Sequence, residues 1–176
     1  KLEEESRILV NEILSEEERK KKLVYMFTSE QYTGAFKLVA FDPHGSEPPR
    51  SRFIDKTSMI KQDMPPDLLQ LRDYEFAALG SKLYFIGGVH IGGVRYYDEA
   101  LASDKVFAFD MAAQAWDFDV PCMKLKRADS TVATYENKIY VFAYNSNRLE
   151  GETPLAEHWA EFFDPQANAW NYLPGP

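Results

Sequence analysis

A threefold internal repeat constrains the fold of this chain more than any other feature. Three apolar segments, each following a basic residue, contain a tyrosine near their start: Leu23–Phe27, Leu83–Ile86 and Ile139–Phe142. Their tyrosines, Tyr25, Tyr84 and Tyr140, are 59 and 56 positions apart. Such a period indicates that one supersecondary unit is repeated about three times along the chain.

Each tyrosine segment is followed by a second apolar segment that ends in Phe-Asp: Val39–Asp42, Val106–Asp110 and Ala160–Asp164. Trp116 and Trp170 lie six positions beyond Asp110 and Asp164. An aspartate that opens a turn can accept hydrogen bonds from backbone N–H groups. The spacing therefore predicts a tight hairpin between the Phe-Asp strand and a tryptophan strand.

A further strand is predicted ahead of the later tyrosine segments, at Tyr74–Leu79 and Ser130–Tyr135, because both are rich in aromatic and β-branched residues. Arg72 and Arg127 precede these strands at similar offsets, 12 and 13 residues before Tyr84 and Tyr140. Each unit is thus expected to have four short antiparallel strands, which is the composition of one propeller blade.

Composition narrows the classes of function. The formal net charge is −8, whereas nucleic-acid and anionic-membrane surfaces are bound by clustered Lys and Arg, so neither is an expected partner. Cys122 is the only cysteine, which excludes an internal disulfide and favours a reducing compartment, cytoplasmic or nuclear. No apolar run reaches the roughly 18 residues of a membrane-spanning helix.

From residue 23 to 176 the chain resembles kelch-repeat β-propellers, and plant-type F-box/kelch proteins in particular. The resemblance rests on the period, on Gly87-Gly88 at the end of the second strand, and on Phe109 and Phe163, each seven residues before a tryptophan. The third unit departs from it, with Ala143-Tyr144 in place of the glycines, as does the first, with Thr28-Ser29. We expect an all-β chain of about three four-stranded blades, near residues 7–55, 70–120 and 127–176, in an incomplete or open propeller.

The charged segment 1–22 has two interpretations. Acidic residues followed by basic ones from Glu16 to Lys22 favour a helix. The register of the repeat instead places a strand at Arg7–Leu14, followed by a long charged turn. The repeat is the better guide, because a pattern found elsewhere in the chain outweighs local propensity.

Candidate chemical groups have ordinary structural explanations. The run Gly87–Gly93 lacks the Lys-Ser/Thr of a phosphate loop, so its first two glycines are expected to allow positive φ and close strand approach. The histidines, His44, His90 and His158, have no metal-ligand spacing. The repeated Asp42, Asp110 and Asp164 fit turn capping, and the repeated Tyr84, Tyr140, Trp116 and Trp170 fit packing between blades. No catalytic residue, metal site or cofactor is expected.

Two long loops, Val89–Asp104 and Tyr144–Glu157, are not required by the repeat. Exposed Arg and Tyr on loops are common anchors of protein interfaces. Partner contacts are therefore predicted at Arg95, Tyr96, Tyr97, Asn145 and Arg148.

These features favour a protein–protein interaction module, and the resemblance implies substrate recognition in a ubiquitin-ligase adaptor. An F-box-like domain would lie outside these residues. The alternative is a fragment of a kelch-type propeller enzyme, such as a metal-dependent oxidase, an isomerase or a specifier-like protein. The resemblance sets conditions for two of these enzymes, a Cys-Tyr crosslink with copper-binding histidines for the oxidase and an acid-x3-Asp-x3-His run for the specifier, and that run is absent.

Three blades would leave two open ends, because closed propellers usually have four to eight. Terminal blades without neighbours expose apolar surface and strand edges. The 176 residues are therefore expected either to self-associate or to be part of a longer propeller.

Overall fold

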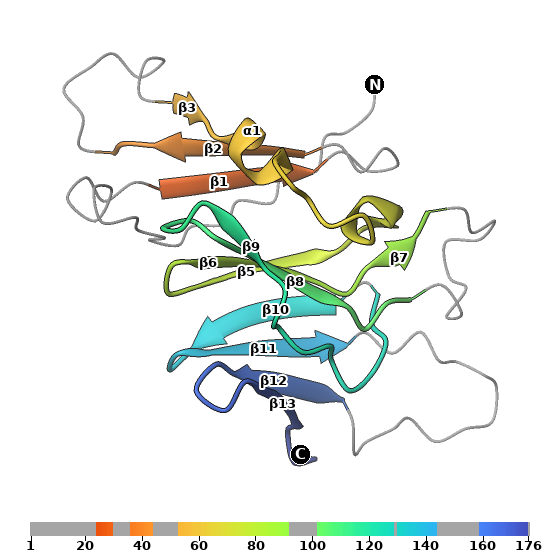
Figure 1. The fold of residues 1–176 in the computed structure, drawn as a ribbon. Coiled ribbons are helices and arrows are strands. Elements are labelled where there is room, and N and C mark those ends of the chain that lie inside the picture. The colour runs from red at the N-terminus through yellow and green to blue at the C-terminus, as the bar shows by residue number, and fades with distance from the viewer. Residues whose placement is uncertain are drawn as a thin grey trace, which may run out of the picture.

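Antiparallel sheets dominate the computed structural model, which describes residues 24–29, 36–43, 53–91, 102–128, 130–143 and 159–175. Three sheets follow one another along the chain and lie in the same order in space (Figure 1). Blade 1 contains β1 (Val24–Ser29), β2 (Phe36–Phe41) and β3 (Phe53–Asp55). Blade 2 contains β5 (Glu75–Leu79), β6 (Lys82–Ile86), β8 (Val106–Asp110) and β9 (Ala115–Asp117). Blade 3 contains β10 (Ser130–Tyr135), β11 (Lys138–Ala143), β12 (Ala160–Asp164) and β13 (Ala169–Tyr172).

The strands of blades 2 and 3 are those predicted from the repeat, and both sheets are four-stranded with neighbours in sequence paired. In blade 1 the described residues form three strands, and the strand predicted at Arg7–Leu14 lies outside them. The all-β expectation and the kelch-type blade architecture are confirmed.

Local turn chemistry sets the hairpins. Glu136 and Asn137 join β10 to β11 with φ angles of 45° and 58°, the pair of positive values that a two-residue hairpin favours. Asp110 begins the turn between β8 and β9, and its Oδ1 accepts hydrogen bonds from the N–H groups of Ala112 and Ala113 at 2.8 and 3.1 Å. Asp164 does the same in blade 3. The predicted capping role of these two aspartates is confirmed.

Two hydrophobic cores lie between the blades. The first joins Leu38 and Ala40 of blade 1 to one face of blade 2, where Phe85 and Phe109 are fully buried. The second joins the other face of blade 2 to blade 3, and its largest members are Tyr84, Phe163 and Trp170. Blade 2 is therefore buried on both faces, because alternate side chains of its strands point to opposite neighbours.

Trp116 and Trp170 each form hydrogen bonds with the chain segment that enters their blade. The indole Nε1 of Trp116 donates to the carbonyl oxygens of Ile60 and Gln62, both at 3.1 Å. The indole of Trp170 donates to Pro121 at 3.0 Å. Both side chains are buried, so the structural role predicted for the tryptophans is confirmed.

The connection from blade 1 to blade 2 contains elements that the repeat did not predict: α1 (Thr57–Lys61), the 3₁₀ helix η3 (Leu68–Gln70) and β4 (Leu71–Arg72). β4 pairs with β7 (Val89–His90), which follows the double glycine. Within the described ranges, no helix has the length and apolar character needed to cross a bilayer.

Candidate partner-binding face

The two ends of the blades differ in the kind of connection that they carry. Tight turns close the hairpins at one end, which we call the turn face: Gly80-Ser81, Met111–Gln114, Glu136-Asn137 and Pro165–Asn168. The other end, which we call the loop face, carries the connections between blades, 56–74 and 118–128. The described residues that flank 92–101 and 144–158 also lie there. In Figure 1 the turn face is on the left and the loop face on the right.

The chain is closely packed at the double glycine of the loop face. Gly87 and Gly88 have φ angles of 66° and 97°. A Cβ on Gly87 would lie 2.6 Å from the carbonyl oxygen of Arg127, and one on Gly88 would lie 2.6 Å from that of Arg72. Only glycine fits here, because the chain passes between the segments that enter blades 2 and 3. The structural interpretation of this pair is confirmed.

Three backbone hydrogen bonds form a closed ring at this point. The Gly88 N–H donates to the Arg127 carbonyl at 3.1 Å, the Arg127 N–H donates to Ser103 at 2.9 Å, and the Ser103 N–H donates back to Gly88 at 2.9 Å. We call these three residues the junction. It joins both sides of the 92–101 segment to the chain that enters blade 3.

A buried ion pair connects the junction to the interior of blade 3. The Arg127 Nε donates to Glu161 Oε1 at 2.7 Å, with side-chain exposures of 2% and 0%. The other carboxylate oxygen of Glu161 accepts a hydrogen bond from the Lys124 N–H at 2.8 Å. A buried charge is tolerated only where it is paired and hydrogen-bonded, and this pair satisfies both conditions.

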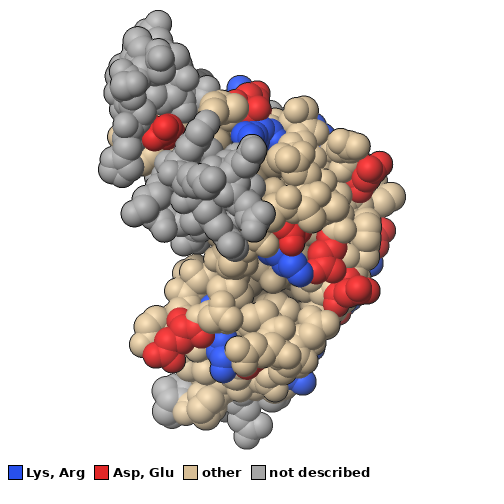
Figure 2. Space-filling view, turned by 60° about the vertical axis from the view of Figure 1, so that its left-hand side comes forward, with Lys and Arg blue, Asp and Glu red and all other residues tan. Residues whose placement is uncertain are grey.

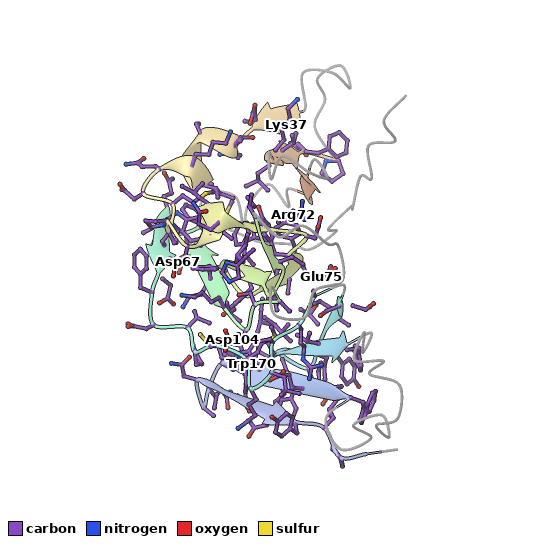
Figure 3. All side chains as sticks on the ribbon, turned by 90° about the vertical axis from the view of Figure 1, so that its right-hand side faces the viewer. Lys37, Asp67, Arg72, Glu75, Asp104 and Trp170 are labelled. Carbon is purple, nitrogen blue, oxygen red and sulfur yellow. The ribbon has the colours of Figure 1, made fainter. Side chains whose placement is uncertain are left out.

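Around the junction the loop face is of mixed polarity. Lys105 forms an ion pair with Asp67, and this hydrogen bond lowers the pKa of the Asp67 carboxyl and raises that of the Lys105 amine. Leu69 and Ile91 are exposed beside it, at 57% and 44%. Their segments are joined by the hydrogen bond from the Ile91 N–H to the Gln70 carbonyl, at 2.7 Å. Figure 3 looks at this side and labels Asp67, Arg72 and Asp104.

The opposite side of the molecule shows no large patch of one charge. Figure 2, turned to bring the turn face forward, shows acidic and basic side chains next to one another on the described surface. Ion pairs near the tight turns include Lys82 with Asp117 and Lys138 with Asp164, the second at 3.2 Å.

All five predicted contact residues, Arg95, Tyr96, Tyr97, Asn145 and Arg148, lie outside the described residues. Their segments join the described chain on the loop face, at Ile91 and Ala102 and at Ala143 and Trp159. Their role stays a prediction.

The histidines and tyrosines fall at different places. His90 is half-buried in β7, while His44 and His158 are outside the described residues. Among the residues that are described, no group of three or more His, Cys, Asp or Glu could hold a metal ion. Tyr84 is buried against Phe163 of blade 3, with ring centroids 5.7 Å apart, but Tyr140 packs on Phe162 within its own blade.

The buried pair of Arg127 and Glu161 was not expected from the sequence. A signal was present, because Arg72 and Arg127 stand at similar offsets before their tyrosines. The repeat gives no such signal for Glu161, because the equivalent position of blade 2 is occupied by Phe107.

Comparison with known proteins agrees with this fold. No family model matches the chain. An F-box/kelch-repeat protein of Arabidopsis thaliana is 33% identical over 100 residues, which are 56% of this chain and 23% of that protein. A second F-box/kelch-repeat protein of the same plant is 31% identical over 96 residues, which are 54% and 21%. The chain thus spans between a fifth and a quarter of the length of these curated relatives.

Among solved structures, YjhT aligns with a TM-score of 0.50 at 14% sequence identity, over 88% of this chain and 48% of that one. YjhT is a kelch-type propeller. The likeness therefore shows the fold of the chain, kelch-type propeller blades, in agreement with the resemblance seen in the repeat.

Proposed function

We propose that this chain is a protein–protein interaction module that binds a partner protein through its loop face. The observation that carries the proposal is the junction of Gly88, Ser103 and Arg127. It gives the segment with Arg95, Tyr96 and Tyr97 a base tied by backbone hydrogen bonds. Recognition residues on loops are effective when a rigid scaffold positions the loop ends.

The chemistry of the loop face supports a protein partner. Arg and Tyr are enriched among residues that dominate interface energetics, and apolar side chains next to them exclude water. Leu69 and Ile91 supply exposed apolar surface where the predicted contact segment begins. The formal net charge of −8 gives no support to a nucleic-acid partner.

We further propose that the protein acts in a ubiquitin-ligase adaptor as its substrate-recognition part, in the cytoplasm or nucleus. The support is that both curated relatives are F-box/kelch-repeat proteins. The proposal extends beyond the aligned region, because that region is a minor part of each relative.

Affinity capture with the tagged chain tests the binding face. The combined change Arg95→Ala, Tyr96→Ala and Tyr97→Ala should abolish capture of a partner that the unchanged chain retains. Phe118→Ala is the matched control, because it removes an aromatic side chain that is 73% exposed outside that segment. Undiminished capture by the triple variant would place the binding surface elsewhere.

The adaptor proposal has a separate readout. Captured complexes of the full-length protein should contain ubiquitin-ligase subunits, and their consistent absence would remove this part of the proposal. Metal analysis of the purified protein addresses the enzyme alternative, which stoichiometric copper or iron would favour. Self-association through exposed strand edges is also proposed, and light scattering of the purified chain tests it.

A further inference from the structure

The 3₁₀ helix η3 and the aspartate before it contact both a blade core and the loop face. Leu68, the first residue of η3, is 2% exposed and belongs to the core between blades 1 and 2. Asp67 and Gln70, at the two ends of the same short segment, bind the described residues on either side of 92–101. We call residues 67–70 the clamp.

The chain that leaves blade 2 toward residue 92 is bound to the clamp through main-chain atoms. The Ile91 N–H donates to the Gln70 carbonyl at 2.7 Å, which extends the pairing of β7 with β4 by one residue. Because β4 and β7 have only two residues each, this hydrogen bond is a substantial part of their contact. The position of Ile91 therefore depends on that of Gln70.

The chain that returns to blade 2 is bound to the clamp through a side chain. Lys105 lies between Ser103 of the junction and β8, and its amine forms an ion pair with Asp67. The main chain of Lys105 is fixed as well, because its N–H donates to Ser103 Oγ at 3.1 Å. Its carbonyl accepts a hydrogen bond from the Gly87 N–H at 2.9 Å. The lysine thus connects an ordered stretch of main chain to the clamp.

The Asp67 carboxylate contacts the returning chain and does not cap its own helix. Aspartate at an N-cap position commonly accepts hydrogen bonds from the first turn of a helix. Asp67 is the N-cap residue of η3, but its side chain makes no capping hydrogen bond. The turn is closed by main-chain atoms, with the Gln70 N–H donating to the Asp67 carbonyl at 3.1 Å. Removal of the carboxylate should therefore break the ion pair and leave η3 formed.

We propose that the clamp positions the two chain stretches that flank residues 92–101 for partner binding, with Asp67, Gln70 and Lys105 as positioning residues. The inference rests on the proposed function, because it concerns the same part of the loop face. Both flanking stretches are bound to one segment, and Leu68 fixes that segment in the core between blades 1 and 2. Ordering both flanks in advance lowers the conformational entropy that is lost on binding.

Hydrogen exchange of the purified chain tests the clamp without a partner. Asp67→Ala should speed exchange of the Ile91 and Ser103 N–H groups roughly two- to fivefold, the range expected when an exposed ion pair is lost. The Ile91 N–H is the decisive reporter, because it is bound to Gln70 and to neither member of the ion pair. The N–H groups of β6 should keep their exchange rates, because the blade cores are unchanged.

Exchange of the two charges separates the ion pair from other effects of substitution. Asp67→Lys and Lys105→Asp should each speed exchange at both reporters, and the double variant should restore slow exchange. Asp119→Ala is the matched control, because it also removes one exposed negative charge from a connection between blades. In about 1 M salt the unchanged chain should approach the rates of Asp67→Ala, whose own rates should hardly change, because salt screens exposed charges.

The effect on binding is measured with the protein identified in the affinity capture described above, produced in recombinant form. Asp67→Ala should weaken its equilibrium binding roughly two- to fivefold, and the double variant with exchanged charges should recover it. Undiminished binding by the triple variant of Arg95, Tyr96 and Tyr97 would refute the proposed function. The exchange rates of the free chain support or refute the clamp independently of that result.

Two results would overturn the inference. Faster exchange at Ser103 without a change at Ile91 would mean that the ion pair acts locally and that the clamp does not join the two flanks. Faster exchange at both, with unchanged affinity for the partner, would mean that the flanks are ordered but that recognition does not depend on it. Urea denaturation of each variant guards against global unfolding, and where Asp67→Ala does not fold, the salt dependence of the unchanged chain decides the question.

Discussion

Gly87 and Gly80 have nearly the same backbone conformation, with φ angles of 66° and 62°, in different surroundings. A Cβ on Gly80 would have nothing within 4 Å, whereas one on Gly87 would meet the Arg127 carbonyl oxygen. The pair therefore separates the cost of a left-handed backbone from the cost of close packing.

Gly80→Ala should lower the free energy of unfolding by roughly 1 kcal/mol, the cost of a left-handed conformation for an L-residue. Gly87→Ala should lower it by roughly 3 kcal/mol or more, because the backbone of the junction must also move. Urea denaturation of both variants measures the difference. Equal losses would show that the crowding at Gly87 has no energetic weight.

Asp117 gives a pH-dependent prediction at the same scale. The hydrogen bond from Lys82 lowers the pKa of the Asp117 carboxyl. A carboxyl whose folded pKa is depressed contributes stability above its unfolded pKa, about 3.9, and loses it as the pH falls through the folded value. Asp117→Asn should therefore cost about 0.5–1 kcal/mol at neutral pH and almost nothing in acid below both pKa values.

Thermal unfolding of Asp117→Asn at several pH values checks this expectation. Asp119→Asn is the control, because it also removes one negative charge, but from an exposed side chain two residues after Asp117. A loss of stability that persists unchanged in acid would attribute the effect of Asp117 to its hydrogen bond with the Asp119 N–H rather than to Lys82.

At the scale of elements, Arg127 and Glu161 join the chain entering blade 3 to the third strand of that blade. Glu161→Gln should cost roughly 3–5 kcal/mol, because it removes the carboxylate charge that pairs with the buried guanidinium. The double variant Arg127→Met, Glu161→Leu should cost less than the single one, since no buried charge remains. A double-mutant cycle by urea denaturation measures the coupling, and additive losses would contradict it.

The hydrogen bond between Trp170 and the connection that leads into blade 3 gives a second prediction at the scale of elements. Trp170→Phe should lower the free energy of unfolding by roughly 1–2 kcal/mol, because the Pro121 carbonyl loses its donor and the core loses volume. Protease cleavage within residues 118–128 should become faster. Trp159→Phe is the control, since that indole also donates to a carbonyl, that of Pro174, but is exposed at 38%. Similar effects of both changes would contradict this account.

The elements that could be predicted from the sequence are those whose signals are local. The hairpin at Glu136-Asn137 and the Asp110 turn are encoded within a few residues, and repetition at a fixed period confirms them. The 3₁₀ helix η3, the helix α1 and β4 were missed, because their stability comes from distant contacts. Thr57, at the start of α1, accepts a hydrogen bond from the Leu38 N–H, 19 residues earlier.

The same distinction applies to the candidate site. Gly87-Gly88 was assigned its backbone role correctly, because positive φ is a property of the residue itself. The ring of hydrogen bonds at Ser103 and Arg127 could not be predicted, since its members come from three separate segments. The prediction that Arg95 and Tyr96 contact a partner rests on residue type and loop position, and a binding experiment tests it.

At the scale of the molecule, blade 2 is the only described blade with a buried core on each face. Its central strands should therefore open least often, because local opening there exposes the most apolar surface. Hydrogen exchange of the purified chain should show β6 and β8 more protected than β2 and β11. Equal protection throughout would mean that the three blades unfold as one cooperative unit.

Because the junction of Gly88, Ser103 and Arg127 is made of main-chain atoms, it does not depend on which side chains the segment between its strands carries. Gly87 and Gly88 cannot accept a larger side chain, because a Cβ there would clash with the backbone, but both lie outside residues 92–101. New sequences and lengths can therefore be transplanted between Ile91 and Ala102 at a closure entropy that grows only logarithmically with length. The same base could thus acquire a new specificity by exchanging one peptide, in evolution or in the laboratory, while the blades keep their cores.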